Sequence, residues 1–189
     1  MLLLLVCFTS LGGWQNDLWI FGLALIFALV GDILLLFPQR FFILGLAVFL
    51  CVHLCYVLGL RPTSPAPNLP TLIIALVVLS VGSLLFGTLR SALQKREDDK
   101  RLIAPLMVYG IALSLMLFSS LLTLLHVDWH AEAAGLTAAG GILFFASDNL
   151  LGYDRFVRSL PNARLWVRMT YHLGQIALIS GVLLNSLLP

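Results

Sequence analysis

Residues 102–125 read LIAPLMVYGIALSLMLFSSLLTLL, a run of 24 residues that contains no charged side chain. About 20 apolar residues in a helix cross the roughly 30 Å hydrocarbon core of a bilayer. Only helices and closed barrels satisfy every backbone hydrogen bond in that environment, and a continuous apolar run of this length is typical of a helix. The stretch therefore predicts a membrane-spanning helix.

Six further segments have the same apolar character. They cover residues 1–13, 17–37, 41–60, 70–89, 133–151 and 165–188, and the first of them is short. The connections between them contain helix-breaking residues, including four prolines within residues 61–70. We therefore predict an all-α, polytopic transmembrane helix bundle of about seven spans that forms a single domain over residues 1–189. The weaker alternative for the first segment is a cleaved signal peptide, although no basic residue precedes its apolar run.

The overall composition supports a membrane protein and argues against other classes. The chain is 60% hydrophobic and 11% charged, with a mean hydropathy of +1.03, so lipid must cover part of its apolar surface. The net charge of +2 is small and its basic residues are dispersed among connections, which argues against nucleic-acid binding. Three cysteines within apolar runs do not predict a disulfide framework. We expect no cofactor, no metal and no obligate protein partner.

Positive charge is strongly asymmetric about the predicted membrane. When successive connections alternate between the two sides, ten basic residues fall on one side and Arg61 alone on the other. By the positive-inside rule, the side with ten basic residues is cytoplasmic, which places the amino terminus inside. Because the connections are compact, we expect a bacterial cytoplasmic membrane. The ten residues are Arg40, Arg90, Lys95, Arg96, Lys100, Arg101, Arg155, Arg158, Arg164 and Arg168.

Two aspartates lie inside predicted spans at matched depth. Asp32 and Asp148 each lie near the cytoplasmic end of a span, while His53 lies deeper in a third span with Tyr56 on the same helix face. An ionisable side chain within hydrocarbon is costly, so each is a candidate functional residue. We predict Asp32, Asp148 and His53 as catalytic residues. The predicted substrate-binding residues are Tyr56, Tyr109, Ser147, Asn149, Tyr171 and Gln175.

The alternative is that such polar groups only join helix to helix by hydrogen bonds, as they commonly do in membrane bundles. This structural interpretation is favoured for Tyr109 and is as good as the functional one for His53. The two aspartates favour a functional site, because a buried carboxyl group must either become neutral or find a partner.

Short motifs around the polar residues, read in order, carry a family resemblance. They are Gly31-Asp32-Ile33-Leu34-Leu35, Gly45 through Phe49, His53 and Tyr56, Phe144 through Ser147-Asp148, Thr170-Tyr171, and Gln175. In this order and spacing the chain resembles the lysoplasmalogenase (YhhN-like) family of multi-span membrane proteins. The resemblance implies hydrolysis of the vinyl ether bond of lysoplasmalogens to a fatty aldehyde and glycerophospho-ethanolamine or -choline. Family members usually have eight spans, so this chain would begin at their second, and His172 inherits no role.

A vinyl ether yields to acid, because protonation of its outer alkene carbon creates an oxocarbenium ion that water captures. In glycosidases, a pair of carboxyl groups catalyses a reaction that passes through a similar cation. We expect Asp32, with only apolar neighbours in sequence, to act as the acid. Asp148, held ionised by the neighbouring Ser147 and Asn149, is expected to act as the base. The substrate is a lysophospholipid within the membrane.

The remaining predicted residues surround this pair. His53 and Tyr56 would orient water or assist proton transfer, while Tyr171 and Gln175 would line the pocket. The lipid phosphate would meet basic residues at the cytoplasmic surface. The candidates for this contact are Arg40, Arg164 and Arg168.

Three other functions fit the same residues. Intramembrane carboxylates also serve proton-coupled transporters, although the inverted repeats and broken helices of many transporters are not visible here. A metal-dependent intramembrane lipid hydrolase would use His53, His172 and the aspartates, although zinc usually requires three protein ligands. A purely structural membrane protein is the third.

Overall fold

The structure, a computed structural model, describes residues 1–60 and 68–188, apart from the side chains at positions 16 and 38–40. Within these ranges the chain forms α-helices joined by short connections and 3-10 turns, and no strand occurs. Arg61 and the prolines up to position 67 lie outside the described residues, as does the side chain of Arg40. The helices are α1 (Leu2–Ser10), α2 (Trp19–Leu35), α3 (Pro38–Leu60), α4 (Leu69–Leu93), α5 (Ile103–Leu122), α6 (Ala131–Phe156) and α7 (Ala163–Leu187).

The predicted all-α bundle is confirmed, with one helix in each predicted apolar segment. Four of the described helical segments are long and apolar enough to cross a membrane, namely Phe41–Leu60, Leu69–Leu93, Glu97–Leu125 and Ala131–Phe156. The α2 helix is apolar but has 17 residues, and the 25-residue α7 carries more polar side chains. The nine residues of α1 extend only about 14 Å at 1.5 Å per residue, less than the hydrocarbon thickness. The protein is an integral membrane protein.

Helices α6 and α7 pack against each other more extensively than any other pair of the described helices. They carry several of the predicted site residues. They approach through glycines: a Cβ atom on Gly140 would lie 2.4 Å from the backbone nitrogen of Leu178, and one on Gly174 would lie 2.9 Å from that of Phe144. Small residues permit such close packing between membrane helices. Across this contact, the Ser147 hydroxyl donates a hydrogen bond to the carbonyl of Val167 at 3.0 Å.

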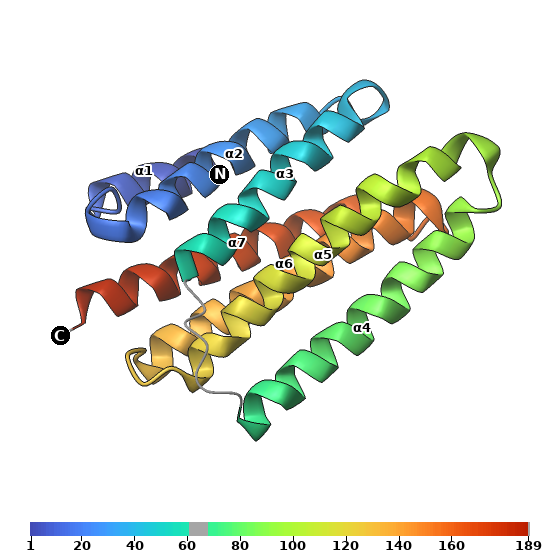
Figure 1. The fold of residues 1–189 in the computed structure, drawn as a ribbon. Coiled ribbons are helices and arrows are strands. Elements are labelled where there is room, and N and C mark those ends of the chain that lie inside the picture. Colours follow the sequence, from blue (N-terminus) through green and yellow to red (C-terminus); the bar gives the residue numbers. More distant parts are fainter. Residues whose placement is uncertain (61–67, 189) are drawn as a thin grey trace.

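The α4 helix lies at one edge of the bundle, beside α5 (Figure 1). Only 6% of its most apolar window is buried within the protein, and residues such as Leu76 and Leu84 are 67% and 72% exposed. In a bilayer such a surface faces lipid chains. On the other side of the bundle, α1 and α2 pack together and α3 joins them to the central helices α5, α6 and α7 (Figure 1).

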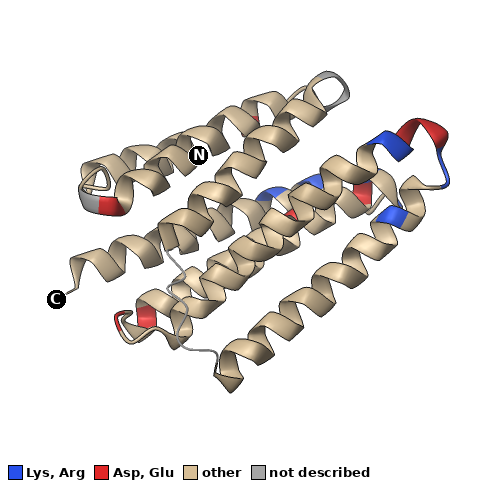
Figure 2. Cartoon of the chain, in the orientation of Figure 1, with Lys and Arg blue, Asp and Glu red and all other residues tan. Residues whose placement is uncertain are grey.

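Charged residues gather where α4 connects to α5 (Figure 2). This connection contains ion pairs between Arg96 and Asp99, at 3.7 Å, and between Lys100 and Glu97, at 2.6 Å. Arg155, near the end of α6, interacts electrostatically with Asp99, so the end of α6 lies at the same end of the bundle. The described basic residues of these two regions therefore lie together, as the charge pattern predicted.

Candidate functional site

Three polar side chains from three helices meet within the bundle. Nε2 of His53 on α3 lies 3.0 Å from the hydroxyl of Tyr109 on α5 and 3.1 Å from Oδ2 of Asp148 on α6. The Tyr109 hydroxyl donates a hydrogen bond to the same Oδ2 at 2.5 Å. His53 is fully buried, and 10% of the Asp148 side chain is exposed. The three predicted residues thus form one hydrogen-bonded cluster.

The hydrogen-bond geometry of this cluster indicates how its protons are arranged. The Tyr109 hydroxyl has one hydrogen, which it donates to Asp148, so Nε2 of His53 can share its own hydrogen with both oxygens. Nδ1 of His53 is buried and has no hydrogen-bond partner. A neutral imidazole with its hydrogen on Nε2 fits this network, because the only atom left without a partner is then a lone-pair acceptor.

A second polar contact lies beside this cluster. The Tyr56 hydroxyl on α3 donates a hydrogen bond to Oε1 of Gln175 on α7, while Nε2 of Gln175 is buried without a partner. The ring of Phe144 separates the two groups, with its centroid 5.0 Å from that of His53 and 6.2 Å from that of Tyr56. Tyr56 and Gln175 therefore join α3 to α7 next to the His53 cluster.

Asp32 lies on a different side of this region, against Tyr171 of α7. The two side chains interact electrostatically, but the geometry falls short of a hydrogen bond, and the buried Tyr171 hydroxyl has no hydrogen-bond partner. Tyr171 also interacts electrostatically with Asp148 and Tyr56. The hydroxyl of Tyr171 is thus the group that both aspartates have in common.

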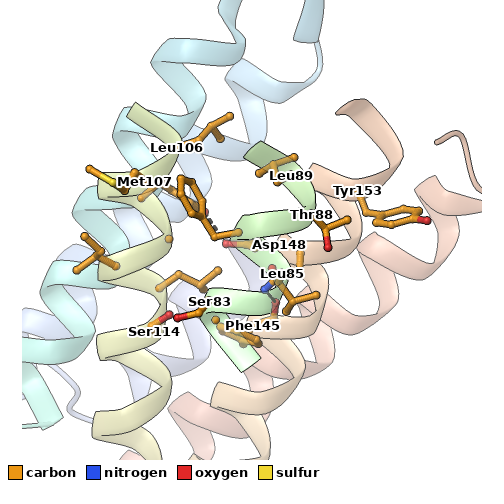
Figure 3. Close-up of a pocket in the computed structure, with 18 of the residues that line it drawn as sticks. Ser83, Leu85, Thr88, Leu89, Leu106, Met107, Ser114, Phe145, Asp148 and Tyr153 are labelled. Carbon is orange, nitrogen blue, oxygen red and sulfur yellow. Dashed lines mark hydrogen bonds between the residues drawn. The ribbon is translucent and has the colours of Figure 1, made fainter. Parts of the chain in front are cut away.

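A cavity of about 490 Å³ opens beside the His53 cluster, between α4, α5 and α6 (Figure 3). Its wall is mostly apolar, and Asp148 and Tyr109 both line it. On α4 the lining extends from Ala75 to Leu89, which is about 21 Å along a helix. A volume of this size, with few polar groups, is typical of a site for an apolar small molecule.

The expectation that both aspartates share one cavity is corrected by this arrangement. Asp148 lines the cavity described above, but Asp32 is not among its lining residues. Sequence depth alone placed the two carboxyl groups at the same level of the membrane without fixing which way each side chain faces. Instead, both carboxyl groups interact electrostatically with Tyr171.

The expected donors to Asp148 are also different. Ser147 bonds to the carbonyl of Val167 and the amide of Asn149 donates to the carbonyl of Phe145 at 2.8 Å, so neither bonds to Asp148. Residues adjacent in a helix point in different directions, and the donors come instead from α3 and α5. Asn149 does line the cavity. Sequence reasoning missed the α4 residues of its wall, such as Ser83 and Thr88, because nothing distinguishes them from other small polar residues in an apolar span.

The residues of the metal hypothesis do not all come together, although His53 lies beside Asp148. Among residues 1–60 and 68–188 no group of three or more His, Cys, Asp and Glu side chains is placed to hold a metal ion. His172 is an exposed residue of α7, whereas His53 is fully buried on α3. The structure therefore offers no ligand set for that hypothesis within the described chain.

Comparison with known proteins adds to this geometry. Residues 1–182 match the YhhN family. Lysoplasmalogenase TMEM86B from Mus musculus is 34% identical over 172 residues, covering 90% of this chain and 66% of the mouse protein. The Homo sapiens lysoplasmalogenase TMEM86B is 33% identical over 169 residues, covering 88% and 64%.

A bacterial relative is similar over the same part of the chain. The lysoplasmalogenase of Mycobacterium tuberculosis (strain CDC 1551 / Oshkosh) is 28% identical over 172 residues, which cover 88% of this chain and 61% of that protein. The chain thus spans just under two thirds of the length of these curated relatives. No solved structure matches it.

Proposed function

This chain belongs to the YhhN family, and we propose that it is a membrane-embedded hydrolase that cleaves the vinyl ether bond of lysoplasmalogens. Relatives named lysoplasmalogenase in mouse, human and Mycobacterium tuberculosis support this substrate. The products would be a fatty aldehyde and glycerophospho-ethanolamine or -choline. The observation that carries the proposal is that Asp148, bonded to buried His53 and Tyr109, lines a long apolar cavity.

The cavity suits the substrate because a lysoplasmalogen has one long apolar chain and a reactive bond at the junction with its polar part. The lining is apolar along most of α4 and α5, and Asp148 brings a carboxyl group to the wall. An alkenyl chain held along α4 would place its vinyl ether beside that carboxyl group. The open, lipid-facing surface of α4 offers a route from the bilayer.

The proposed reaction consumes one water molecule and needs a proton donor and a proton acceptor. Protonation of the outer alkene carbon gives an oxocarbenium ion, and water then forms a bond to the carbon that bears the ether oxygen. A base removes a proton from that water, and the resulting hemiacetal collapses, breaking its bond to the glycerol oxygen. As this bond breaks, the hemiacetal hydroxyl loses its proton, the glycerol oxygen gains a proton, and the aldehyde is released.

We assign the base to Asp148 and the acid to Asp32, as the sequence predicts, although Asp32 does not line the cavity and its proton must reach the substrate through another group. His53 and Tyr109 both lie within hydrogen-bonding distance of Oδ2 of Asp148, and they position this carboxyl group to accept a proton from water. Tyr171 interacts with both carboxyl groups and has no hydrogen-bond partner. A proton passing between Asp32 and the cavity would have to pass through the Tyr171 hydroxyl, which would first have to form a hydrogen bond with each carboxyl group in turn. That transfer would restore both residues after each turnover.

The proposal is tested by replacing Asp148 with Asn in the purified protein and measuring fatty aldehyde by mass spectrometry after incubation with a lysoplasmenyl lipid. Removal of a general base typically lowers the rate by about 10²- to 10⁴-fold. The matched control is Asp154→Asn on the same helix, where Asp154 accepts a hydrogen bond from the Leu160 amide outside this cavity. Wild-type protein without aldehyde release, or an Asp148→Asn variant with full activity, would contradict the proposal.

We further propose that the membrane is a bacterial cytoplasmic membrane with the charged end of the bundle inside. The gathering of basic residues at the α4–α5 connection and the end of α6 supports this orientation. A reporter that is active only outside the cytoplasm, fused after residue 96, should be inactive. An active reporter would show that the protein has the opposite orientation.

A further inference from the structure

Arg155 packs against the wall of the cavity near the charged end of the bundle. Cζ of Arg155 lies 3.8 Å from the centroid of the Phe42 ring and 5.6 Å from that of Phe156. Both rings line the cavity and pack edge to face, with centroids 5.7 Å apart. The guanidinium group is thereby held against two rings of the cavity wall, one from α3 and one from α6, although Arg155 is not itself a lining residue.

Arg155 and Asp148 are related by the geometry of α6. They are seven residues apart, which is about two helical turns, so their side chains leave the same face of the helix about 10 Å apart along its axis. Asp148 lies on the wall of the cavity, and Arg155 packs on the ring of Phe42, which also lines the cavity. A ligand that contacts Asp148 can therefore extend its neighbouring polar part toward Arg155.

The chemistry of the cavity changes along its length in the same direction. Beyond Asp148, toward Ala75 and Phe118, the wall suits an alkyl chain, whereas the Phe42 and Phe156 end carries a permanent positive charge. In a lysoplasmalogen the vinyl ether separates an apolar chain from a three-carbon glycerol unit and an anionic phosphodiester. The order of chain, reactive bond and anion matches the order of apolar wall, Asp148 and Arg155.

We propose that Arg155 binds the phosphodiester of the lysolipid and fixes the register of the substrate, so that the vinyl ether lies at Asp148. This inference rests on the proposed function for the identity of the lipid. A guanidinium group has five N–H donors, so Arg155 can bind a phosphate while it keeps its other interactions, such as that with Asp99. Arg164 and Arg168, expected from sequence to meet the phosphate, lie on α7, which contributes no residue to the cavity wall.

The test measures binding apart from turnover. Two probes that cannot be hydrolysed as vinyl ethers are compared: a saturated 1-O-alkyl lysophosphoethanolamine and the phosphate-free 1-O-alkylglycerol of the same chain length. Each is titrated into the protein in detergent for wild type, Arg155→Met and Arg155→Lys. Arg158→Met, at the next exposed arginine, is the matched control. Methionine retains an apolar stem against Phe42, and lysine retains the charge.

We expect Arg155→Met to weaken binding of the phospholipid probe about tenfold or more while changing binding of the alkylglycerol less than twofold. Arg155→Lys should give a smaller loss, and Arg158→Met should leave both affinities unchanged. Unchanged phospholipid binding by Arg155→Met overturns the inference, and so does an equal loss for both probes, which would indicate a structural role. Phosphate-dependent binding without aldehyde release from the lysoplasmenyl lipid would leave this inference standing and remove the proposed hydrolysis.

Discussion

Nε2 of His53 lies 3.1 Å from Oδ2 of Asp148, although 95 positions separate the two residues in the sequence. The contact joins α3 to α6 within the membrane-spanning part of the bundle, and Tyr109 of α5 completes it. A fully buried imidazole beside a carboxyl group on a cavity wall is an arrangement suited to proton transfer. The first prediction tests whether this contact serves catalysis or only packing.

Replacement of His53 by Phe should lower kcat for aldehyde release by about a hundredfold or more, because it removes the partner that shares protons with Asp148. Stability should change little, because Tyr109 still bonds to Asp148 and the buried, partnerless Nδ1 is removed. Steady-state kinetics and thermal unfolding in detergent measure the two effects. A folded His53→Phe variant with wild-type kcat would reduce the contact to a structural one.

The second prediction concerns the hydroxyl of Tyr171. Tyr171→Phe should leave the free energy of unfolding unchanged or slightly higher, because the lost hydroxyl is buried without a partner. Activity should nevertheless fall about tenfold or more if this hydroxyl carries protons between the aspartates. Kinetics and thermal unfolding of the same preparation separate the two quantities.

Tyr56→Phe is the matched comparison for Tyr171→Phe. It deletes a hydroxyl that does bond, and it leaves the buried Gln175 side chain without that partner. We expect it to destabilise the protein by about 1–3 kcal/mol. Equal stability losses for the two variants would show that the Tyr171 hydroxyl has a bonding partner after all.

The sequence alone was sufficient for much of the architecture, because long apolar runs and one-sided basic charge follow directly from the physics of the bilayer. It also led us to predict His53 and Asp148 as site residues, because ionisable groups in apolar spans are few, and the structure brings these two side chains together. It did not establish that Tyr109 completes their cluster, because the spacing of residues along one helix carries no information on which neighbouring helix each face meets.

The cavity wall was harder to predict for the same reason. Ser83 and Thr88 line it from α4, whose sequence has the composition of any lipid-facing helix. Asp32 was predicted as a site residue from its depth in the membrane, but the direction of its side chain depends on how α2 packs. In the structure this side chain faces Tyr171 and not the cavity. Depth follows from hydropathy, whereas direction follows from tertiary packing.

The close approach of α6 and α7 gives a prediction for stability. Gly140→Ala should destabilise the protein by about 1–3 kcal/mol, because the new Cβ atom would lie 2.4 Å from the backbone nitrogen of Leu178 and the helices must separate. Activity should fall as well, since α6 and α7 position Asp148 and Tyr171. Thermal unfolding in detergent measures the first effect and aldehyde release the second.

Gly135→Ala on the same helix is the control for that variant. A Cβ atom at Gly135 meets no atom within 4 Å, so the change should be neutral or should stabilise the helix by up to about 1 kcal/mol. If the two alanine variants unfold at the same temperature, the α6–α7 contact is looser than the structure indicates.

The last prediction concerns the far end of the cavity and the length of the alkenyl chain in the proposed reaction. Ala75 lines the cavity near the end of α4 that lies away from the charged connection, so Ala75→Phe should shorten the space available to the alkenyl chain. We expect kcat/KM to fall for lysoplasmalogens with long chains and to stay near wild type for short ones, because only a long chain would meet the new ring. Leu76→Phe is the control, since Leu76 is 67% exposed and does not line the cavity. A uniform loss across chain lengths in Ala75→Phe, or the same selectivity in Leu76→Phe, would show that the alkenyl chain does not extend along α4.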